Sequence, residues 1–252
     1  MRVITHRLIC VLAVLYAWQA GAQDIRYGQF EVTFTPAQLL DQPTVDSVSE
    51  VIGADEEITW KMYVPETYDA NKPAGLMVYI SPSDKGSMPG KWRAVVDEEN
   101  LIWISANHSG NDTHTAKRML YAVLGPQIAA QDYRIDAGRT YLSGFSGGGK
   151  VAGLVAIDFA NLFRGAIYIC GAEHWMNDPP KLLAQVMTNR YVFLSGHEDF
   201  NLGLTRKIHR QYENAGVPNI ELMIIPRMGH KTPNTKDFRR AINFLDERKQ
   251  ND

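Results

Sequence analysis

Short runs dense in apolar residues recur along the chain, and this feature limits the folds open to the sequence more than any other. Runs of this length and density are typical of strands that are covered on both faces of a sheet. They occupy residues 75–80, 101–105, 140–144, 166–170, 191–195 and 221–225. Two earlier segments, 30–35 and 57–63, alternate apolar and polar residues, as half-exposed strands do.

Segments with helical periodicity separate these runs. We expect helices over 90–99, 114–131, 147–159, 204–215 and 236–248. Because strands alternate with helices, the pattern predicts an α/β architecture in which right-handed crossovers join a largely parallel sheet. The dipeptide Gly125-Pro126 falls within the second of these helices and is expected to kink or split it, since proline lacks the N–H that a helix interior uses.

The N-terminus has the pattern of a signal peptide. Arg2 and Arg7 precede a short apolar run at 8–18, and the small residues at 20–22 suit cleavage before Gln23. The apolar run is too short for a stable membrane span, although an uncleaved N-terminal anchor is the alternative. We therefore expect residues 1–22 to be removed and the protein to be periplasmic or secreted.

No repeat or flexible linker divides the remainder, so residues 23–252 are expected to form a single domain. The formal net charge is −2, and no block of Lys and Arg suggests a surface for nucleic acid. The predicted mature chain contains Cys170 alone, which excludes an internal disulfide there. Cys170 lies in an apolar run, which favours a buried and inert thiol.

The sharpest motif is Gly144-Phe145-Ser146-Gly147-Gly148, which matches G-x-S-x-G. An apolar strand precedes it and a helical segment follows, which is the setting of a nucleophile elbow. Such a turn exposes the serine Oγ above the sheet and directs the N–H of the next residue toward developing negative charge. A glycine-rich phosphate loop is the alternative, but Val151 follows Lys150 where that motif requires Ser or Thr.

A nucleophilic serine needs a base and an acid that orients the base. His230 is the best candidate base, because it follows the last predicted strand and could reach Ser146 at the carboxyl edge of the sheet. A structural role in its loop is the alternative. Asp199, which follows the strand at 191–195, is the preferred acid; Glu198 and Glu173 compete with it, and capping of the following helix is its alternative role.

Further candidates surround this trio. Gly147 and the loop after the strand at 75–80 should supply oxyanion donors, and Ser83 is the candidate there because Pro82 has no N–H. A simple turn is the alternative for this loop. The polar segment 107–114 is interpreted as a loop at the rim of the site rather than a metal site. Trp175 could line a substrate pocket or serve only in packing.

Residues 57–245 resemble the α/β-hydrolase superfamily, and in particular compact exported esterases grouped with polyhydroxybutyrate-depolymerase-like and feruloyl-esterase-like enzymes. The segments at 62–68, 132–149, 194–201 and 228–230 carry this resemblance. It implies an α/β-hydrolase fold with a mostly parallel eight-stranded sheet and helices on both faces. It also implies Ser146 as nucleophile, Asp199 as acid and His230 as base. Ser81-Pro82 departs from the His-Gly that such esterases usually carry after the third strand.

The combined expectation is a serine hydrolase that cleaves carboxylic esters, either small or attached to a polymer, through an acyl-enzyme. No cofactor or metal is expected, and neither is a nucleic-acid partner or a stable membrane anchor. Two alternatives remain open at this stage. One is a serine peptidase of the prolyl-oligopeptidase type, which would use the same triad. The other is a non-catalytic relative that binds a ligand outside the cytoplasm, because fold alone does not settle function.

Overall fold

The computed structural model of the protein describes residues 25–174 and 180–247, so the predicted signal peptide and Trp175 lie outside the described residues. Every strand that the sequence predicts is present. The strands are β1 Gly28–Phe34, β2 Ile58–Val64, β3 Ala74–Ile80, β4 Leu101–Ala106, β5 Ile135–Phe145, β6 Gly165–Ile169, β7 Arg190–Gly196 and β8 Ile220–Ile225. They form one sheet in the order β1-β2-β4-β3-β5-β6-β7-β8. Antiparallel pairing is limited to β1 with β2 and β2 with β4, and all other neighbours are parallel.

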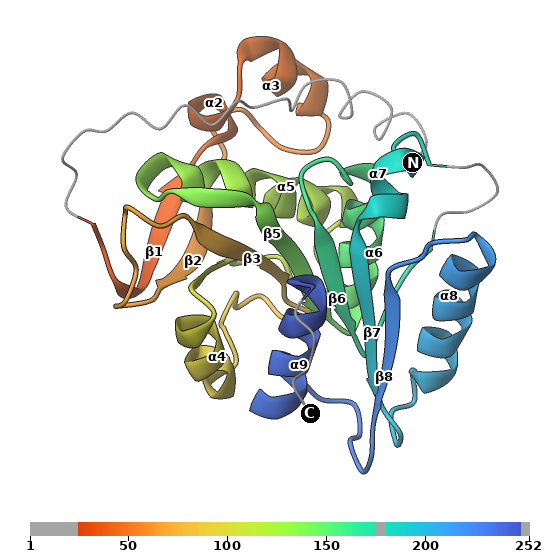
Figure 1. Ribbon diagram of the computed structural model, residues 1–252. Helices are drawn as coiled ribbons and strands as arrows, with labels where there is room; N and C mark the ends of the chain where they lie inside the picture. Colours follow the sequence, from red (N-terminus) through yellow and green to blue (C-terminus); the bar gives the residue numbers. More distant parts are fainter. Residues whose placement is uncertain (1–24, 175–179, 248–252) are drawn as a thin grey trace.

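Helices cover both faces of this sheet (Figure 1). On one face lie α5 (Thr115–Asp132), α6 (Gly147–Asp158) and α8 (Leu202–Asn214); on the other lie η1 (Gly90–Trp92), α4 (Arg93–Glu98) and α9 (Thr235–Leu245). The alternation of side chains along each strand separates the two cores. In β3, Leu76 and Val78 pack with the first group, while Met77 and Tyr79 pack with the second. This two-sided burial explains why the central strands are apolar at nearly every position.

Short helices were not anticipated from the sequence. These are α2 (Pro36–Leu39) and α3 (Gln42–Val48), which lie between β1 and β2, and α7 (Leu183–Thr188), which precedes β7. Each spans seven residues or fewer, so it offers too few turns for an apolar periodicity to be recognised. The helix α3 nevertheless begins with a normal cap, since the Asp41 side chain accepts the N–H of Thr44 at 3.0 Å.

The sequence predicted a kink or a split of the helix at Gly125-Pro126, and the split does not occur. Helix α5 runs through both residues without interruption. A Cβ on Gly125 would lie 3.1 Å from Val78 Cγ2, so the absent side chain lets α5 pack directly against β3. We attribute the continuity of α5 to this burial, which offsets the hydrogen bond that Pro126 cannot donate.

The parallel strands β5, β6, β7 and β8 all end at the same edge of the sheet. Ser146 follows β5, Cys170 follows β6, Asp199 lies just beyond β7, and His230 follows β8. The fold therefore gathers residues that are up to 84 positions apart at the carboxyl edge, which is where open α/β sheets build their sites.

Candidate active site

Ser146 occupies a strained turn between β5 and α6. Its backbone has φ 55° and ψ −121°, a left-handed conformation that is rare for a residue with a side chain. The turn is tied to the end of β6, because the Ser146 N–H donates to Ile169 O at 2.8 Å. The end of β3 also approaches the start of α6 closely, since a Cβ on Gly148 would overlap Ile80 O. The local structure is thus the strand–turn–helix arrangement that a nucleophile elbow requires.

Ser146, His230 and Asp199 form one chain of hydrogen bonds. His230 Nε2 lies 2.9 Å from Ser146 Oγ, and His230 Nδ1 lies 2.8 Å from Asp199 Oδ1. The two competing acids are not part of this chain. Glu198 is exposed, and the Glu173 carboxylate accepts the His174 N–H at 3.2 Å. Of the three acids that the sequence left open, the structure places Asp199 against His230.

Asp199 is buried and surrounded by hydrogen-bond donors. Its Oδ2 accepts from Ser195 Oγ at 2.7 Å, and its Oδ1 accepts from the Asn201 N–H at 3.0 Å. Burial alone would raise the pKa of this carboxyl, but the hydrogen bonds from Cys170, Asn201, Ser195 and His230 together lower it below its ordinary value. Asp199 therefore stays ionised and can hold the Nδ1–H tautomer of His230, which leaves Nε2 free to accept the Ser146 proton.

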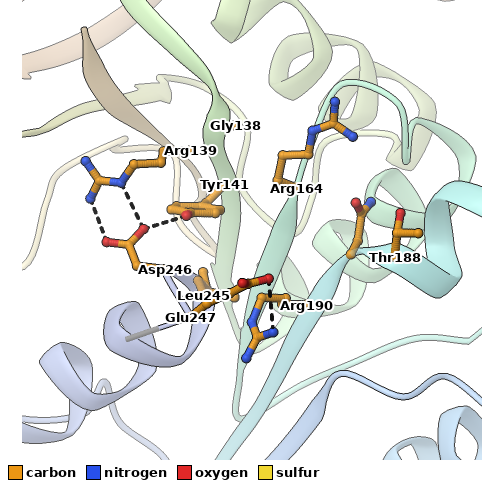
Figure 2. Close-up of a pocket in the computed structure, with 10 residues that line it drawn as sticks. Gly138, Arg139, Tyr141, Arg164, Thr188, Arg190, Leu245, Asp246 and Glu247 are labelled. Carbon is orange, nitrogen blue, oxygen red and sulfur yellow. Dashed lines mark hydrogen bonds and ion pairs between the residues drawn. The ribbon is translucent and has the colours of Figure 1, made fainter. Parts of the chain in front are cut away.

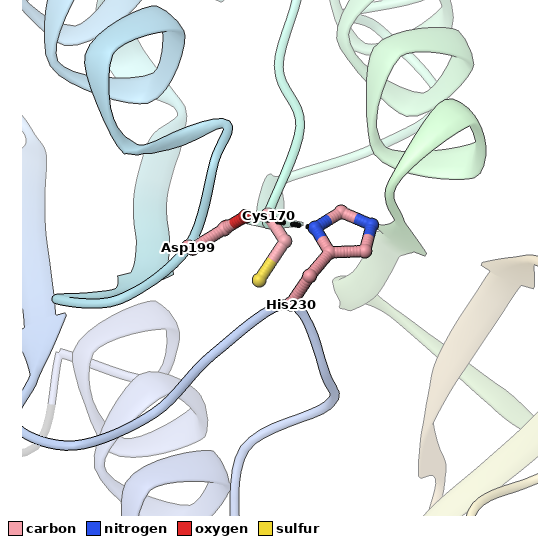
Figure 3. Close-up of side chains that lie close together, drawn as sticks. All are labelled: Cys170, Asp199 and His230. Atoms are coloured by element: carbon pink, nitrogen blue, oxygen red, sulfur yellow. Dashed lines mark hydrogen bonds and ion pairs between the residues drawn. The ribbon is translucent and has the colours of Figure 1, made fainter.

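Cys170 lies beside Asp199 and His230 (Figure 3), and its Sγ is within 4.8 Å of the facing Asp199 oxygen and His230 nitrogen. Burial, together with its interaction with Asp199, raises the pKa of the thiol to about 12, so the thiol stays protonated. A thiol, a carboxylate and an imidazole could in principle bind a metal ion. Here the imidazole and the carboxylate are hydrogen-bonded to each other, and that contact accounts for the cluster.

The loop that carries His230 is fastened to the rest of the fold. Trp92 Nε1 donates to Pro233 O at 3.0 Å, and Lys91 Nζ donates to Thr232 O at 2.8 Å. On the other side of the loop, the N–H of Glu198 donates to Met228 O at 3.0 Å. These contacts hold the loop on both sides of His230.

Two aromatic rings flank the imidazole. Phe145 lies 4.9 Å from the His230 ring, and Phe200 stacks on it with ring centres 4.1 Å apart and planes inclined by 28°. Phe200 is 77% exposed, so its free face is open to solvent directly beside the reacting groups. The sequence analysis missed Phe200, and its position immediately after Asp199 was the available signal.

Three further residues were predicted at the site: Gly147 and Ser83 as oxyanion donors and Trp175 as a pocket residue. Gly147 opens α6, and a Cβ there would lie 2.8 Å from Cγ of Asn111, so the rim loop 107–114 does reach the elbow. The Ser83 N–H donates to Ser81 Oγ at 3.1 Å, which engages the predicted oxyanion donor within its own turn. Trp175 lies outside the described residues, and its role stays a prediction.

A separate cavity of about 380 Å³ lies at the opposite, amino edge of the sheet (Figure 2). Its lining contains three arginines and two acids: Arg139, Arg164, Arg190, Asp246 and Glu247. Two of the arginines are paired, Arg139 with Asp246 at 2.7 Å and Arg190 with Glu247 at 3.4 Å. The cavity contains none of the residues that the sequence selects for chemistry.

Within the described part of the chain, no helix combines the length and apolar composition of a membrane span. No protein-family model matches the sequence, and none of the curated proteins compared with it does so either.

Solved structures give clear similarities at low sequence identity. Est1E from Butyrivibrio proteoclasticus superposes with a TM-score of 0.59 at 14% identity, over 78% of this chain and 96% of its own. The feruloyl esterase module from Clostridium thermocellum, solved as an S954A mutant with sinapinate, superposes with a TM-score of 0.60 at 12% sequence identity. The match covers 86% of this chain and 85% of that module.

A peptidase gives a comparable result over part of its length. Dipeptidyl peptidase 4 from Porphyromonas gingivalis superposes with a TM-score of 0.56 at 16% identity, over 78% of this chain. The chain spans only 34% of that peptidase. The strand order, the elbow and these superpositions together show that the protein has the α/β-hydrolase fold.

Proposed function

We propose that the protein is a serine hydrolase that cleaves carboxylic esters through an acyl-enzyme. One observation carries the proposal: Ser146 Oγ, His230 and the buried Asp199 are joined by hydrogen bonds of 2.9 and 2.8 Å at a strained turn. A left-handed serine costs free energy of order 1–3 kcal/mol, so its presence beside an aligned base is itself a sign of function.

In the proposed reaction, Ser146 Oγ bonds to the carbonyl carbon of the ester while His230 Nε2 takes its proton. The carbonyl electron pair moves to the oxygen, and the Gly147 N–H stabilises the resulting oxyanion, because the first N–H groups of a helix have no partner within it. The imidazolium, held by Asp199, then protonates the alcohol as the C–O bond breaks. A water molecule, activated by His230, hydrolyses the acyl-enzyme and restores Ser146.

The proposed substrate class is an ester whose acyl or alcohol part is apolar. The exposed face of Phe200 offers a surface for such a group next to His230. The similarity to a feruloyl esterase module is consistent with this choice but shows the fold alone. The N-terminal pattern supports the further proposal that the enzyme acts outside the cytoplasm. Its esters are proposed to be either small or attached to a polymer.

Peptide hydrolysis is the competing activity, since the same three residues could perform it and a dipeptidyl peptidase shares the fold. The substrate assays described below distinguish the two activities.

The test is labelling of the purified protein with a fluorophosphonate probe, followed by turnover of short-chain p-nitrophenyl esters and of dipeptide p-nitroanilides. We expect labelling and ester turnover in the wild type, and a loss of roughly 10⁶-fold in kcat in Ser146→Ala. Turnover of the anilides alone would replace the esterase proposal with a peptidase. A folded wild type that neither labels nor turns over any substrate would favour a ligand-binding protein.

A further inference from the structure

The backbone donor that the sequence predicts in the loop after β3, the Ser83 N–H, is already engaged in the structure. The fold normally supplies one N–H from the residue after the nucleophile and a second from the loop after β3. In that loop Pro82 has no N–H, and the Ser83 N–H already donates to Ser81 Oγ at 3.1 Å. The Ser81 and Ser83 hydroxyls also lie 3.0 Å apart, so they form a second hydrogen bond within the same turn. Neither Pro82 nor Ser83 therefore offers a free N–H to an oxyanion, so a donor from another element can contribute.

Asn111 lies where such a donor would be useful. A Cβ on Gly147 would lie 2.8 Å from Asn111 Cγ and 3.1 Å from Nδ2, and it would overlap Oδ1. The amide group thus rests directly on the Cα of the residue that follows Ser146, and the glycine at 147 is what permits this approach. Gly147 and Asn111 are 36 positions apart in the sequence, so the contact is a product of the fold.

The backbone around Asn111 is fixed, while its side chain is free to act. The Asn111 N–H donates to Pro82 O at 3.0 Å, and the His108 N–H donates to Asp84 O at 2.6 Å. Asp84 Oδ1 also accepts the Gly110 N–H at 3.3 Å. By contrast, the exposed Asn111 amide has no hydrogen-bond partner among the residues that the structure describes. A half-turn about its Cβ–Cγ bond exchanges Oδ1 and Nδ2 and so presents an N–H to a ligand without breaking a bond.

We propose that the Asn111 side-chain amide is the second oxyanion donor. This inference rests on the proposed ester hydrolysis and completes it. As Ser146 Oγ bonds to the carbonyl carbon, the Gly147 N–H and one Nδ2–H of Asn111 donate to the oxygen that becomes negative. Asn111 keeps both of its protons throughout, because its contribution is a hydrogen bond and not a proton transfer.

A side-chain amide in this role selectively stabilises the transition state, since the hydrogen bond strengthens as charge develops on the oxygen. Removal of one oxyanion donor of this kind lowers kcat by about 10²–10³-fold. Substrate binding in the ground state should change little, because the neutral carbonyl is a weaker acceptor. The signature of the role is therefore a fall in kcat at nearly constant KM.

The experiment compares the full-length wild type with Asn111→Ala, Asn111→Asp and Asp112→Asn, using kcat and KM for p-nitrophenyl acetate and the rate of fluorophosphonate labelling. The aspartate variant has almost the same shape but no N–H, and its charge opposes the oxyanion. Asp112→Asn alters the exposed neighbour in the same loop and serves as the matched control. The Tm of each variant verifies that it is folded.

We expect kcat to fall roughly 10²-fold or more in Asn111→Ala, and further in Asn111→Asp, with labelling slowed in parallel and Asp112→Asn unchanged. Labelling and kcat within about threefold of wild type in a folded Asn111→Ala would overturn the role of Asn111 and leave the proposed hydrolase standing. A rise in KM at constant kcat would also overturn it, in favour of a ground-state contact. Failure of the wild type to label or to turn over the ester would overturn both proposals.

Discussion

The two edges of the central sheet each bury an aspartate, and the two aspartates have different neighbours. At the carboxyl edge, Asp199 accepts from His230, Ser195 and a backbone N–H. At the amino edge, Asp246 accepts from Arg139 Nε at 2.9 Å, from Arg139 Nη2 at 2.7 Å and from the Tyr141 hydroxyl at 2.5 Å. The Asp199 side chain is fully buried, and that of Asp246 is 3% exposed.

The two aspartates differ in whether the group that each one binds can take part in proton transfer. Arg139 stays charged at every ordinary pH, and burial followed by the Asp246 hydrogen bond raises the pKa of Tyr141, so no proton moves at the amino edge. His230 Nε2 instead lies 2.9 Å from the hydroxyl of a serine in a strained backbone, from which it can accept a proton. A buried carboxylate thus supports structure when its partner is a fixed cation, and supports chemistry when its partner is an imidazole.

Among changes at these two edges that leave Ser146 in place, the largest expected effect comes from Asp199→Asn. The amide can favour the wrong imidazole tautomer and cannot stabilise the imidazolium, so kcat should fall on the order of 10⁴-fold. Steady-state kinetics with p-nitrophenyl acetate measure this loss. Glu198→Gln is the matched control and should keep wild-type activity; the reverse pattern would transfer the role of the acid to Glu198.

The corresponding change at the amino edge, Asp246→Asn, should affect stability and not catalysis. It leaves the Arg139 charge partly buried without its partner, which should cost roughly 2–4 kcal/mol in the free energy of unfolding. Urea denaturation measures the loss, and kcat/KM should remain within about twofold of wild type. Glu98→Gln, which removes an exposed partner of Arg239, is the control and should leave the urea midpoint almost unchanged. A large loss of activity in folded Asp246→Asn would show that the two edges are coupled.

The features of the fold and site that arise from neighbouring residues in the chain can be predicted from the sequence. Six strands are recognisable because they are dense in apolar residues, and the first two because apolar and polar residues alternate along them. The elbow is recognisable because its glycines and serine are adjacent. The order of Ser146, Asp199 and His230 follows from the strands that precede them. The long polar start of β5 was missed, since its first residues pair only through Ala74 and Ile135 before the register shifts.

The rest depends on contacts between distant segments, which a single sequence does not reveal. The approach of Asn111 to Gly147 and the position of Cys170 beside Asp199 are visible only once the loops are placed. At Gly125-Pro126, contacts between distant segments likewise override a prediction made from local sequence. Local propensity predicts a break there, but packing of α5 on β3 keeps the helix continuous.

A smaller effect should follow from Ser195→Ala, which removes one donor from Asp199. Hydrogen bonds lower the pKa of Asp199 in the folded state, so their stabilisation is present above the unfolded pKa of about 3.9 and is lost as the pH falls through the folded value. We expect the variant to be about 1–2 kcal/mol less stable at pH 7, with the difference shrinking in acid.

Urea denaturation of wild type and variant between pH 3 and pH 7, a range set by that reference pKa, tests this pH dependence. Ser143→Ala is the matched control, because Ser143 is equally buried but donates to the carbonyl of Ile167 and not to a carboxylate. Its loss of stability should be independent of pH. A difference for Ser195→Ala that is equally constant with pH would mean that Asp199 is not stabilised through this hydrogen bond.

The smallest expected effect is that of Phe200→Ala. If the exposed ring supports an apolar part of the ester, KM should rise about three- to tenfold for a p-nitrophenyl ester with a longer acyl chain, because each buried CH₂ contributes about 0.8 kcal/mol. The acetyl ester should be nearly unaffected. Tyr27→Ala, which removes an exposed aromatic ring from the N-terminal end of the described chain, is the control. An equal fall in kcat for both esters would instead assign Phe200 to holding the His230 ring, which its 4.1 Å stacking also allows. The length dependence of KM therefore decides whether the carboxyl edge, unlike the amino edge, presents an apolar surface to its ligand.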